Sequence, residues 1–164
     1  MARLHAPRGL LSLALTTTLA ATCESGRAES TPSRAGAEGR NAVTMIEIVA
    51  GDRRWKARID STPAGRDFLA QLPLELTLKD FGGNEKIADL PRPLTRKDEP
   101  VAATPRAGDV AFYAPWGNLA IFYRDGHHSP GLIPLGRIEG SAAPFEERGP
   151  VKVSIQPVAT APSK

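Results

Sequence analysis

The chain has 164 residues, of which 41% are apolar and only 5% aromatic, and its formal net charge is +3. This length suits one domain with tails, and its core must consist mainly of Leu, Ile, Val and Ala. Two of the positive charges, Arg3 and Arg8, lie in the first ten residues, and no Lys/Arg-rich patch with interleaved aromatics follows, which argues against nucleic-acid binding.

The first 23 residues have the pattern of an export signal. Basic residues precede the uncharged run GLLSLALTTTLAATC, residues 9–23, which is too short to span a bilayer comfortably. The end of this run resembles a bacterial lipoprotein signal, in which Cys23, the single cysteine of the chain, would be lipidated. The alternative is ordinary cleavage near residues 20–22, or after Ala28, which would release a soluble periplasmic protein. We therefore expect an exported protein that contacts a membrane only through a lipid on Cys23.

Residues 24–42 contain mostly Ser, Gly, Ala, Glu and Arg and have almost nothing to bury. This composition predicts a disordered tether between the signal and the folded domain. The domain is predicted to span residues 43–157, and residues 158–164 to form a frayed tail.

The domain begins with two segments of period-two alternation, TMIEIVA and RRWKARI, which flank Gly51-Asp52 and predict a β-hairpin. Thr62 followed by Pro63 predicts the start of a short helix, with Thr62 as its N-cap, and Pro73 ends it. The alternating run LPLELTLKDF then predicts a strand that ends before the turn at residues 82–84.

The second half of the domain is predicted to contain four or five further strands. Residues 85–90 form a candidate short strand, and residues 90–106, with four prolines and many charges, are predicted to be a long surface loop. The strands that follow are expected in GDVAFYAP, NLAIFYRD, LIPLGRIE and VKVSIQPV, and Pro134 in the third of these predicts a sheet edge or a bulge. Seven or eight short strands and one helix predict a small closed barrel with the helix at one end, because closure removes exposed sheet edges.

Four segments follow one another along the chain: the hairpin, TPAGRDFLAQLPLELTLKDF, RAGDVAFYAPWGNLAIFYRDG and LIPLGRIEG. In this order they resemble the bacterial cyclophilin-like family, which is related in fold to the cyclophilin prolyl isomerases. The resemblance covers roughly residues 44–156. It implies a mainly β protein, a closed cyclophilin-like barrel of about eight strands with one or two short helices. It implies no particular activity, because a fold does not carry a function.

The resemblance also allows a comparison with a cyclophilin active site, which presents an Arg beside a pocket of Phe, Trp, His and Gln. Phe122 matches the position of the pocket Phe, and we also interpret it as a core residue of a barrel strand. Lys79 or Asp80 stands where the catalytic Arg would be, and Lys lacks the fixed fork of a guanidinium. The remaining positions depart from the pattern as well: Leu132 replaces the His, Ala120 replaces the Gln, no Trp follows the strand, and Trp116 lies on its other side. Isomerase activity of the usual kind is therefore not expected.

Alternation along the strand places Phe122 and Tyr123 on opposite faces, so only one of them can face a groove. We take Phe122, Lys79, Tyr113 and Leu132 as groove candidates.

No cofactor, metal centre or hydrolase triad is predicted. Asp125, His127 and His128 form a polar cluster that could ligate a metal only with other ligands, and a solvated turn is the preferred interpretation. Ser61, Ser129 and Ser141 lack the context of an activated nucleophile.

Two functions of different classes remain. The first is a binding module that holds a peptide or a small molecule in a groove of the barrel. The second is a divergent prolyl isomerase of the cell envelope, and a purely structural role at the envelope is a third interpretation.

Overall fold

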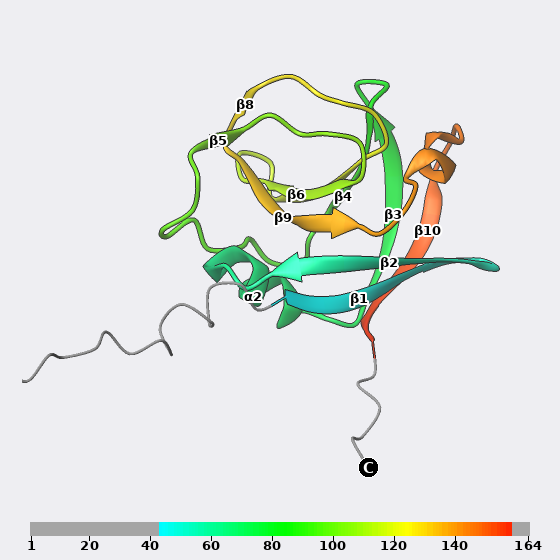
Figure 1. Ribbon diagram of the computed structural model, residues 1–164, viewed down its shortest axis with the longest axis horizontal. Coiled ribbons are helices and arrows are strands. Elements are labelled where there is room, and N and C mark those ends of the chain that lie inside the picture. Colours follow the sequence, from blue (N-terminus) through cyan, green and yellow to red (C-terminus); the bar gives the residue numbers. More distant parts are fainter. Residues whose placement is uncertain (1–42, 159–164) are drawn as a thin grey trace, which may run out of the picture. The chain divides into compact units, whose positions relative to one another are not determined.

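The computed structural model describes residues 43–158, which fold into a closed β-barrel (Figure 1). The predicted export signal, the lipidation of Cys23, the tether and all but the first residue of the tail lie outside the described residues. The strands are β1 (Val43–Ala50), β2 (Arg53–Asp60), β3 (Leu74–Phe81), β4 (Glu85–Asp89), β5 (Ala102–Ala103), β6 (Asp109–Tyr113), β7 (Asn118–Phe122), β8 (Ser129–Pro130), β9 (Leu132–Ile138) and β10 (Val151–Pro157). The helices are α2 (Pro63–Leu69) and a short 3₁₀ turn, η1 (Ala143–Glu146).

Eight of the strands close the barrel in the order β1-β10-β3-β4-β7-β6-β9-β2, and every pairing is antiparallel. The remaining two strands, β5 and β8, pair with each other in a separate two-stranded sheet. The prediction of a mainly β, eight-stranded closed barrel with one or two short helices is confirmed.

The predicted hairpin is formed by β1 and β2, which pair along their whole length from Val43–Asp60 to Ala50–Arg53. Gly51 in its turn has φ +58°, a left-handed conformation that glycine adopts without steric cost. Alternation directs Ile46 and Ile48 into the barrel, where both are fully buried. At the far end of the chain, the Val158 N–H donates to Met45 O at 3.0 Å, so the pairing with β1 extends one residue beyond β10.

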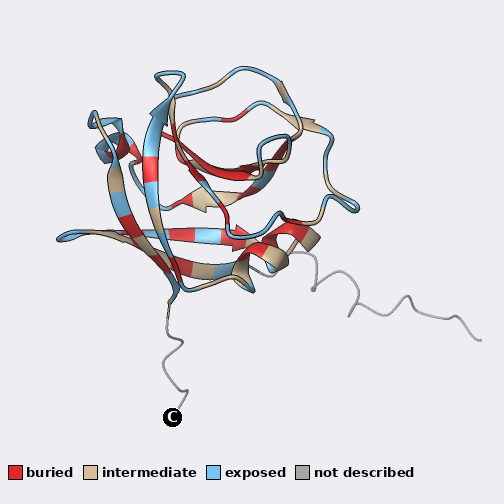
Figure 2. Ribbon diagram, turned by 180° about the vertical axis from the view of Figure 1, so that it is seen from behind, coloured by how far each residue is buried: buried red, intermediate tan, exposed pale blue. Residues whose placement is uncertain are grey.

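The barrel interior is filled by one apolar cluster to which most of the barrel strands contribute (Figure 2). Its largest fully buried side chains include Phe68, Phe112 and Phe145. Phe68 belongs to α2, which packs against β2 and β9, so the helix closes this part of the barrel as the sequence predicts. Phe145 of η1 packs on Trp55, with ring centroids 4.5 Å apart.

The helix and the strand with an internal proline form as predicted. The Thr62 side chain accepts a hydrogen bond from Gly65 N at 3.0 Å, which is the expected N-cap. On β9, the register with β6 shifts between Val110 and Ala111, which pair with Gly136 and Pro134. The predicted irregularity at Pro134 is therefore a bulge.

The predicted surface loop, residues 90–106, differs from expectation in two respects. It buries Leu90 and Leu94 against the core, and it contains the strand β5. It is also tied to α2, because Asp67 Oδ2 accepts from Thr95 N at 2.8 Å. Leu90 continues the alternation of buried Ala88, whereas Leu94 stands among prolines and charged residues that give no periodic pattern.

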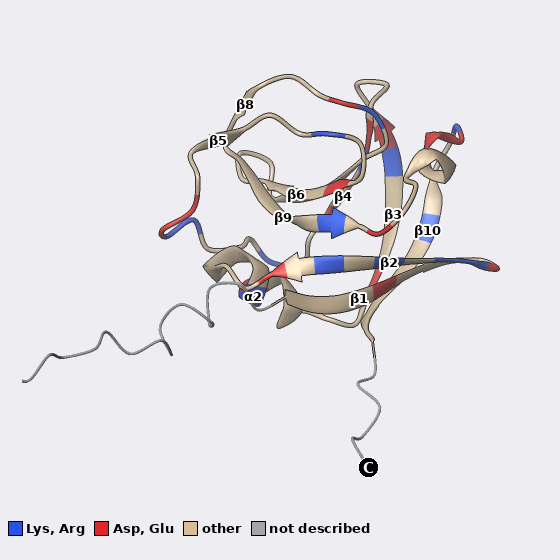
Figure 3. Cartoon of the chain, viewed as in Figure 1, with Lys and Arg blue, Asp and Glu red and all other residues tan. Residues whose placement is uncertain are grey.

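The strands β6 and β7 are buried on both faces, and all five residues of β7 are buried. One face points into the barrel; on the other, Ala111, Ala120, Phe122 and Leu132 form a second apolar cluster. Ala103 of β5 packs against this cluster from outside. In Figure 1 the segments that carry β5 and β8 curve around this side of the barrel, and Figure 3 shows no charged residue on either of these two short strands. Among the described residues, no helix has the length and apolar character needed to cross a membrane.

Candidate functional site

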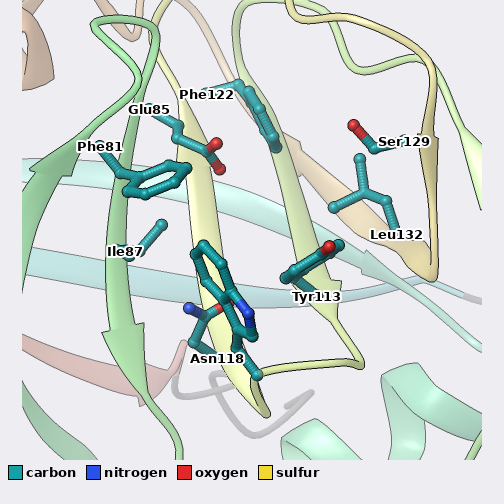
Figure 4. A pocket seen from close by; sticks show the side chains of 9 residues that line it. Phe81, Glu85, Ile87, Tyr113, Asn118, Phe122, Ser129 and Leu132 are labelled. Atoms are coloured by element: carbon teal, nitrogen blue, oxygen red, sulfur yellow. The ribbon is translucent and has the colours of Figure 1, made fainter.

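A cavity of about 250 Å³ lies on the outer face of the barrel wall, beside the second apolar cluster (Figure 4). Six elements or their adjoining turns contribute to it: β3, β4, β6, β7, β8 and β9. Its lining residues are Phe81, Glu85, Ile87, Tyr113, Trp116, Asn118, Phe122, Ser129 and Leu132.

Strand pairing brings these side chains together from distant parts of the sequence. Glu85 of β4 stands directly opposite Phe81 of β3 on one side and Phe122 of β7 on the other. Tyr113 of β6 stands opposite both Asn118 and Leu132. Directly opposed residues of antiparallel strands project to the same face, so the register places all of them on the outside of the barrel.

Aromatic side chains form one side of the cavity. The Trp116 ring meets the Phe81 ring at 5.1 Å and 90°, and the Tyr113 ring at 5.2 Å and 89°. Such edge-to-face pairs are favourable arrangements of aromatic rings. Nevertheless 55% of Trp116 and 43% of Phe81 is exposed to solvent. Large apolar side chains gathered at the edge of a cavity are typical of binding surfaces.

Glu85 is the one charged residue in the cavity lining. Its half-buried carboxyl points into the space between the Phe81 and Phe122 rings (Figure 4). Burial raises the pKa of Glu85 from 4.5 to about 7, and no hydrogen bond or opposite charge counteracts the desolvation. The carboxyl therefore changes its charge near neutral pH.

A second polar group in the cavity lacks a partner. Asn118 is 2% exposed, and its Oδ1 accepts no hydrogen bond within the part of the chain that the structure describes. An unpaired buried oxygen is costly, because the hydrogen bonds that water gave it are not replaced. This oxygen has no accessible surface, so a ligand could reach it only if the side chain moved.

A second hollow of about 320 Å³ adjoins the first and shares Phe81, Glu85, Phe122 and Ser129 with it. The loop after β7 adds Asp125 and His127 to its lining. Together the two hollows form an outer groove, defined here as all residues that line either one.

The polar cluster of residues 125–128 makes local contacts. Asp125 accepts a hydrogen bond from Ala107 N at 2.9 Å, and His128 Nδ1 lies 3.1 Å from Thr104 Oγ1. Across residues 43–158, no three His, Cys, Asp or Glu side chains come close enough together to hold a metal ion.

Three of the four groove candidates named from the sequence, Phe122, Tyr113 and Leu132, line the cavity together. Phe122 and Tyr123 lie on opposite faces, as the alternation predicts: Tyr123 belongs to the core cluster inside the barrel. Lys79, the fourth candidate, is exposed on the outer face opposite Ile87 but does not line the cavity.

Trp116 precedes the strand of Phe122 in the chain, whereas the pocket Trp of a cyclophilin is expected after it. Trp116 nevertheless lines the cavity with Phe122. The reason is the turn between β6 and β7, in which Tyr113 O accepts from both Trp116 N and Gly117 N and the chain reverses. The Trp116 ring thereby packs against the Tyr113 ring.

Sequence reasoning missed Phe81, Glu85, Ile87, Asn118 and Ser129 as cavity residues. Their positions depend on strand register, for which the sequence offers no direct signal. The alternation of β3 and β4 does predict that Phe81 shares a face with Lys79, and Glu85 a face with Ile87.

The residues aligned with the catalytic Arg of a cyclophilin have other surroundings here. Asp80 points to the inner side of β3, where its Oδ1 lies 2.7 Å from Lys86 Nζ and its Oδ2 accepts from Gly149 N at 2.8 Å. The Lys86 hydrogen bond is the main reason that the pKa of Asp80 lies below its usual value. Asp80 is therefore engaged away from the cavity.

The model of the Cyclophilin-like family matches residues 48–156, which include nearly the whole barrel. The chain belongs to the cyclophilin-like family. The barrel also resembles the solution structure of a hypothetical protein from Archaeoglobus fulgidus, with a TM-score of 0.57 and 16% sequence identity over 73% of this chain and 98% of that one. At this identity the likeness shows the fold alone. No curated protein matches the chain. Membership of the cyclophilin-like family therefore establishes the barrel, and the chemistry must be argued from the cavity itself.

Proposed function

We propose that this cyclophilin-like domain is a binding module that holds a peptide segment or a small molecule in the outer groove. The observation that carries this proposal is the exposure of Phe81 and Trp116 at the edge of a cavity that also holds the half-buried carboxyl of Glu85. Apolar walls with a few polar groups are typical of ligand sites. The two adjoining hollows share four lining residues, so a ligand in one can extend into the other.

Phe122 favours a second candidate, prolyl isomerisation, because it lines the cavity at the position where cyclophilins carry a pocket Phe. Against this candidate, no Arg lines the cavity and Lys79 lies outside it. Lowering the roughly 20 kcal/mol barrier of an X-Pro bond requires a donor near the prolyl nitrogen, and the side chains that line the cavity include no cationic donor.

The test is a titration of the full-length ¹⁵N-labelled protein with N-acetylated tripeptide amides that cover the twenty residues at the central position. We expect shifts in the Trp116 indole signal and in the amides of β7 for a subset of peptides. Trp116→Ala should abolish these shifts, whereas Val101→Ala, which removes an even more exposed apolar side chain outside the groove, should leave them unchanged. If no peptide, and no compound of a metabolite panel, perturbs the groove, the binding function is refuted.

A protease-coupled assay with proline peptides separates the two candidates. A rate equal to the uncatalysed one supports the binding module. A rate enhancement that Phe122→Ala removes would establish the isomerase instead.

We further propose that the domain acts outside the cytoplasm, either as a lipoprotein anchored through Cys23 or as a soluble periplasmic protein. The basic start and uncharged run of residues 1–23 support this proposal. Cell fractionation with labelled palmitate distinguishes the forms: a lipoprotein carries the label and loses it in Cys23→Ser. Recovery of the uncleaved protein in the cytosol would refute export.

A further inference from the structure

The charge of the outer groove is unusual for a cavity with apolar walls. In the cavity itself the one ionisable acid is Glu85, and the adjoining hollow adds Asp125 and His127. Lys79 of β3 lies on the same outer face but outside both linings. At neutral pH the groove therefore carries more negative than positive charge.

The surroundings of Glu85 match the requirements of a cation. A carboxylate in an apolar site is unfavourable unless an opposite charge or hydrogen-bond donors accompany it. Phe81 and Phe122 stand directly opposite Glu85 on the two neighbouring strands, so an ion bound to the carboxylate would also meet their rings. Aromatic faces attract cations through the negative charge of their π-systems.

Asn118 lies at the other end of the cavity. On β7 it is four residues from Phe122, the partner of Glu85, and a strand rises by about 3.3 Å per residue, so the backbone separation is about 13 Å. A ligand whose charge is held by Glu85 can therefore extend along the cavity toward Asn118.

We propose that the outer groove binds an alkylammonium group, which Glu85 and the rings of Phe81 and Phe122 hold at the cavity. This inference rests on the proposed binding function and names the class of ligand. The group can belong to a small amine or to a lysine side chain of a bound peptide. The raised pKa of Glu85 is consistent with it, because a bound cation would restore the ionised form near neutral pH.

Two pairs of probes of matched shape test the role of charge on the full-length protein, with the Trp116 and β7 NMR signals as readout. Choline is compared with its neutral isostere 3,3-dimethyl-1-butanol, and N-acetyl-lysine amide with N-acetyl-2-aminoheptanamide, whose side chain ends in a methyl group where lysine has its ammonium. At about pH 8.5, where Glu85 is mostly ionised, we expect one or both cations to bind about tenfold more tightly than the neutral partner. A preference in the first pair alone identifies a small amine, and in the second pair alone a lysine side chain.

The preference should nearly vanish in Glu85→Gln and at about pH 5.5, where the carboxyl is protonated. Glu75→Gln, the same change at an exposed position of β3 outside the groove, should retain it. His127 also lines the adjoining hollow, so the Glu85→Gln variant decides which of the two groups is responsible.

If in neither pair the cation binds more tightly than its neutral isostere, the alkylammonium inference is overturned and the binding function is left intact. A preference that persists in Glu85→Gln also overturns it. If none of the four probes perturbs the groove, the inference is again refuted, and the tripeptide titration judges the binding function separately.

Discussion

Glu85 and Lys86 are neighbours in the sequence, but their side chains lie on opposite sides of the barrel wall. Glu85 faces the outer cavity without a partner, whereas Lys86 is fully buried inside. The Lys86 ammonium lies 2.7 Å from Asp80 Oδ1 and donates to the carbonyl oxygens of Glu147 and Gly149 at 2.7 Å. One residue thus belongs to the candidate site, and the other fastens the segment before β10 to the barrel.

Replacing Glu85 by Gln should stabilise the domain at alkaline pH. The pKa of Glu85 is about 7 in the folded chain and 4.5 as the ordinary value, so the folded state holds the proton more tightly. The free energy of unfolding of the wild type therefore falls as the pH rises from about 4.5 to about 7, and the loss is complete above this window. Because solvent screens the half-buried carboxyl, we expect Glu85→Gln to be more stable by about 1 to 2 kcal/mol at pH 8.

Urea unfolding followed by circular dichroism at pH 4 and pH 8 measures this difference. Glu75→Gln, at an exposed position on β3, controls for the loss of one negative charge. A gap between Glu85→Gln and the wild type that is the same at both pH values would contradict the assignment.

Replacing Lys86 by Met should destabilise the domain by about 2 kcal/mol, because the two backbone carbonyl oxygens that the buried ammonium contacts would lose their donor. Asp80 and the carbonyl oxygens of Glu147 and Gly149 would lose their donor. The matched control is Lys79→Met on the exposed face of β3, which should have little effect. Equal urea midpoints for Lys86→Met and the wild type would show that the three contacts contribute nothing net.

Replacing Gly136 by Ala should be among the most damaging single changes in the barrel. A Cβ at this position would lie 2.0 Å from the backbone oxygen of Arg58, on the neighbouring strand β2. Neither backbone can move away without breaking the pairing between β2 and β9. We therefore expect the free energy of unfolding to fall by more than about 4 kcal/mol, or the domain not to fold. Gly51→Ala, where the positive φ is unfavourable but space is open, should cost only about 1 to 2 kcal/mol. Comparable thermal midpoints for the two variants would refute the steric argument.

Replacing Glu99 by Ala should loosen the start of α2. Its Oε1 accepts a hydrogen bond from Ala64 N at 2.6 Å, so a residue of the long loop completes the N-terminal capping that Thr62 begins. We expect the free energy of unfolding to fall by about 1 kcal/mol, as for the loss of other helix caps. Amide hydrogen exchange measures this directly. The exchange rate of the Ala64 amide should rise in Glu99→Ala and stay at the wild-type value in Lys97→Ala, which changes an exposed neighbour. Unaltered protection of Ala64 would show that the cap is not needed.

Much of the fold could be predicted because its signals are local. Period-two alternation identified the strands, Thr62-Pro63 identified the start of the helix, and Gly51-Asp52 identified the first turn. Alternation was also sufficient to place Phe122 and Tyr123 on opposite faces of β7. These features depend on the residues themselves and their immediate neighbours.

The candidate site depends on contacts between distant segments, and only the tertiary structure decided it. Glu85 lies beside Phe122 because β4 pairs with β7 in one register, and a shift of one residue would have turned Glu85 inward. Lys86 could occupy the interior only because Asp80 and two backbone carbonyls meet it there. Trp116 lines the cavity because the turn between β6 and β7 reverses the chain there. The sequence by itself determined which segments are strands and which of their faces are apolar. Closure of the barrel decided which outward side chains share a cavity, because barrel registers are set by the packing of all eight strands together.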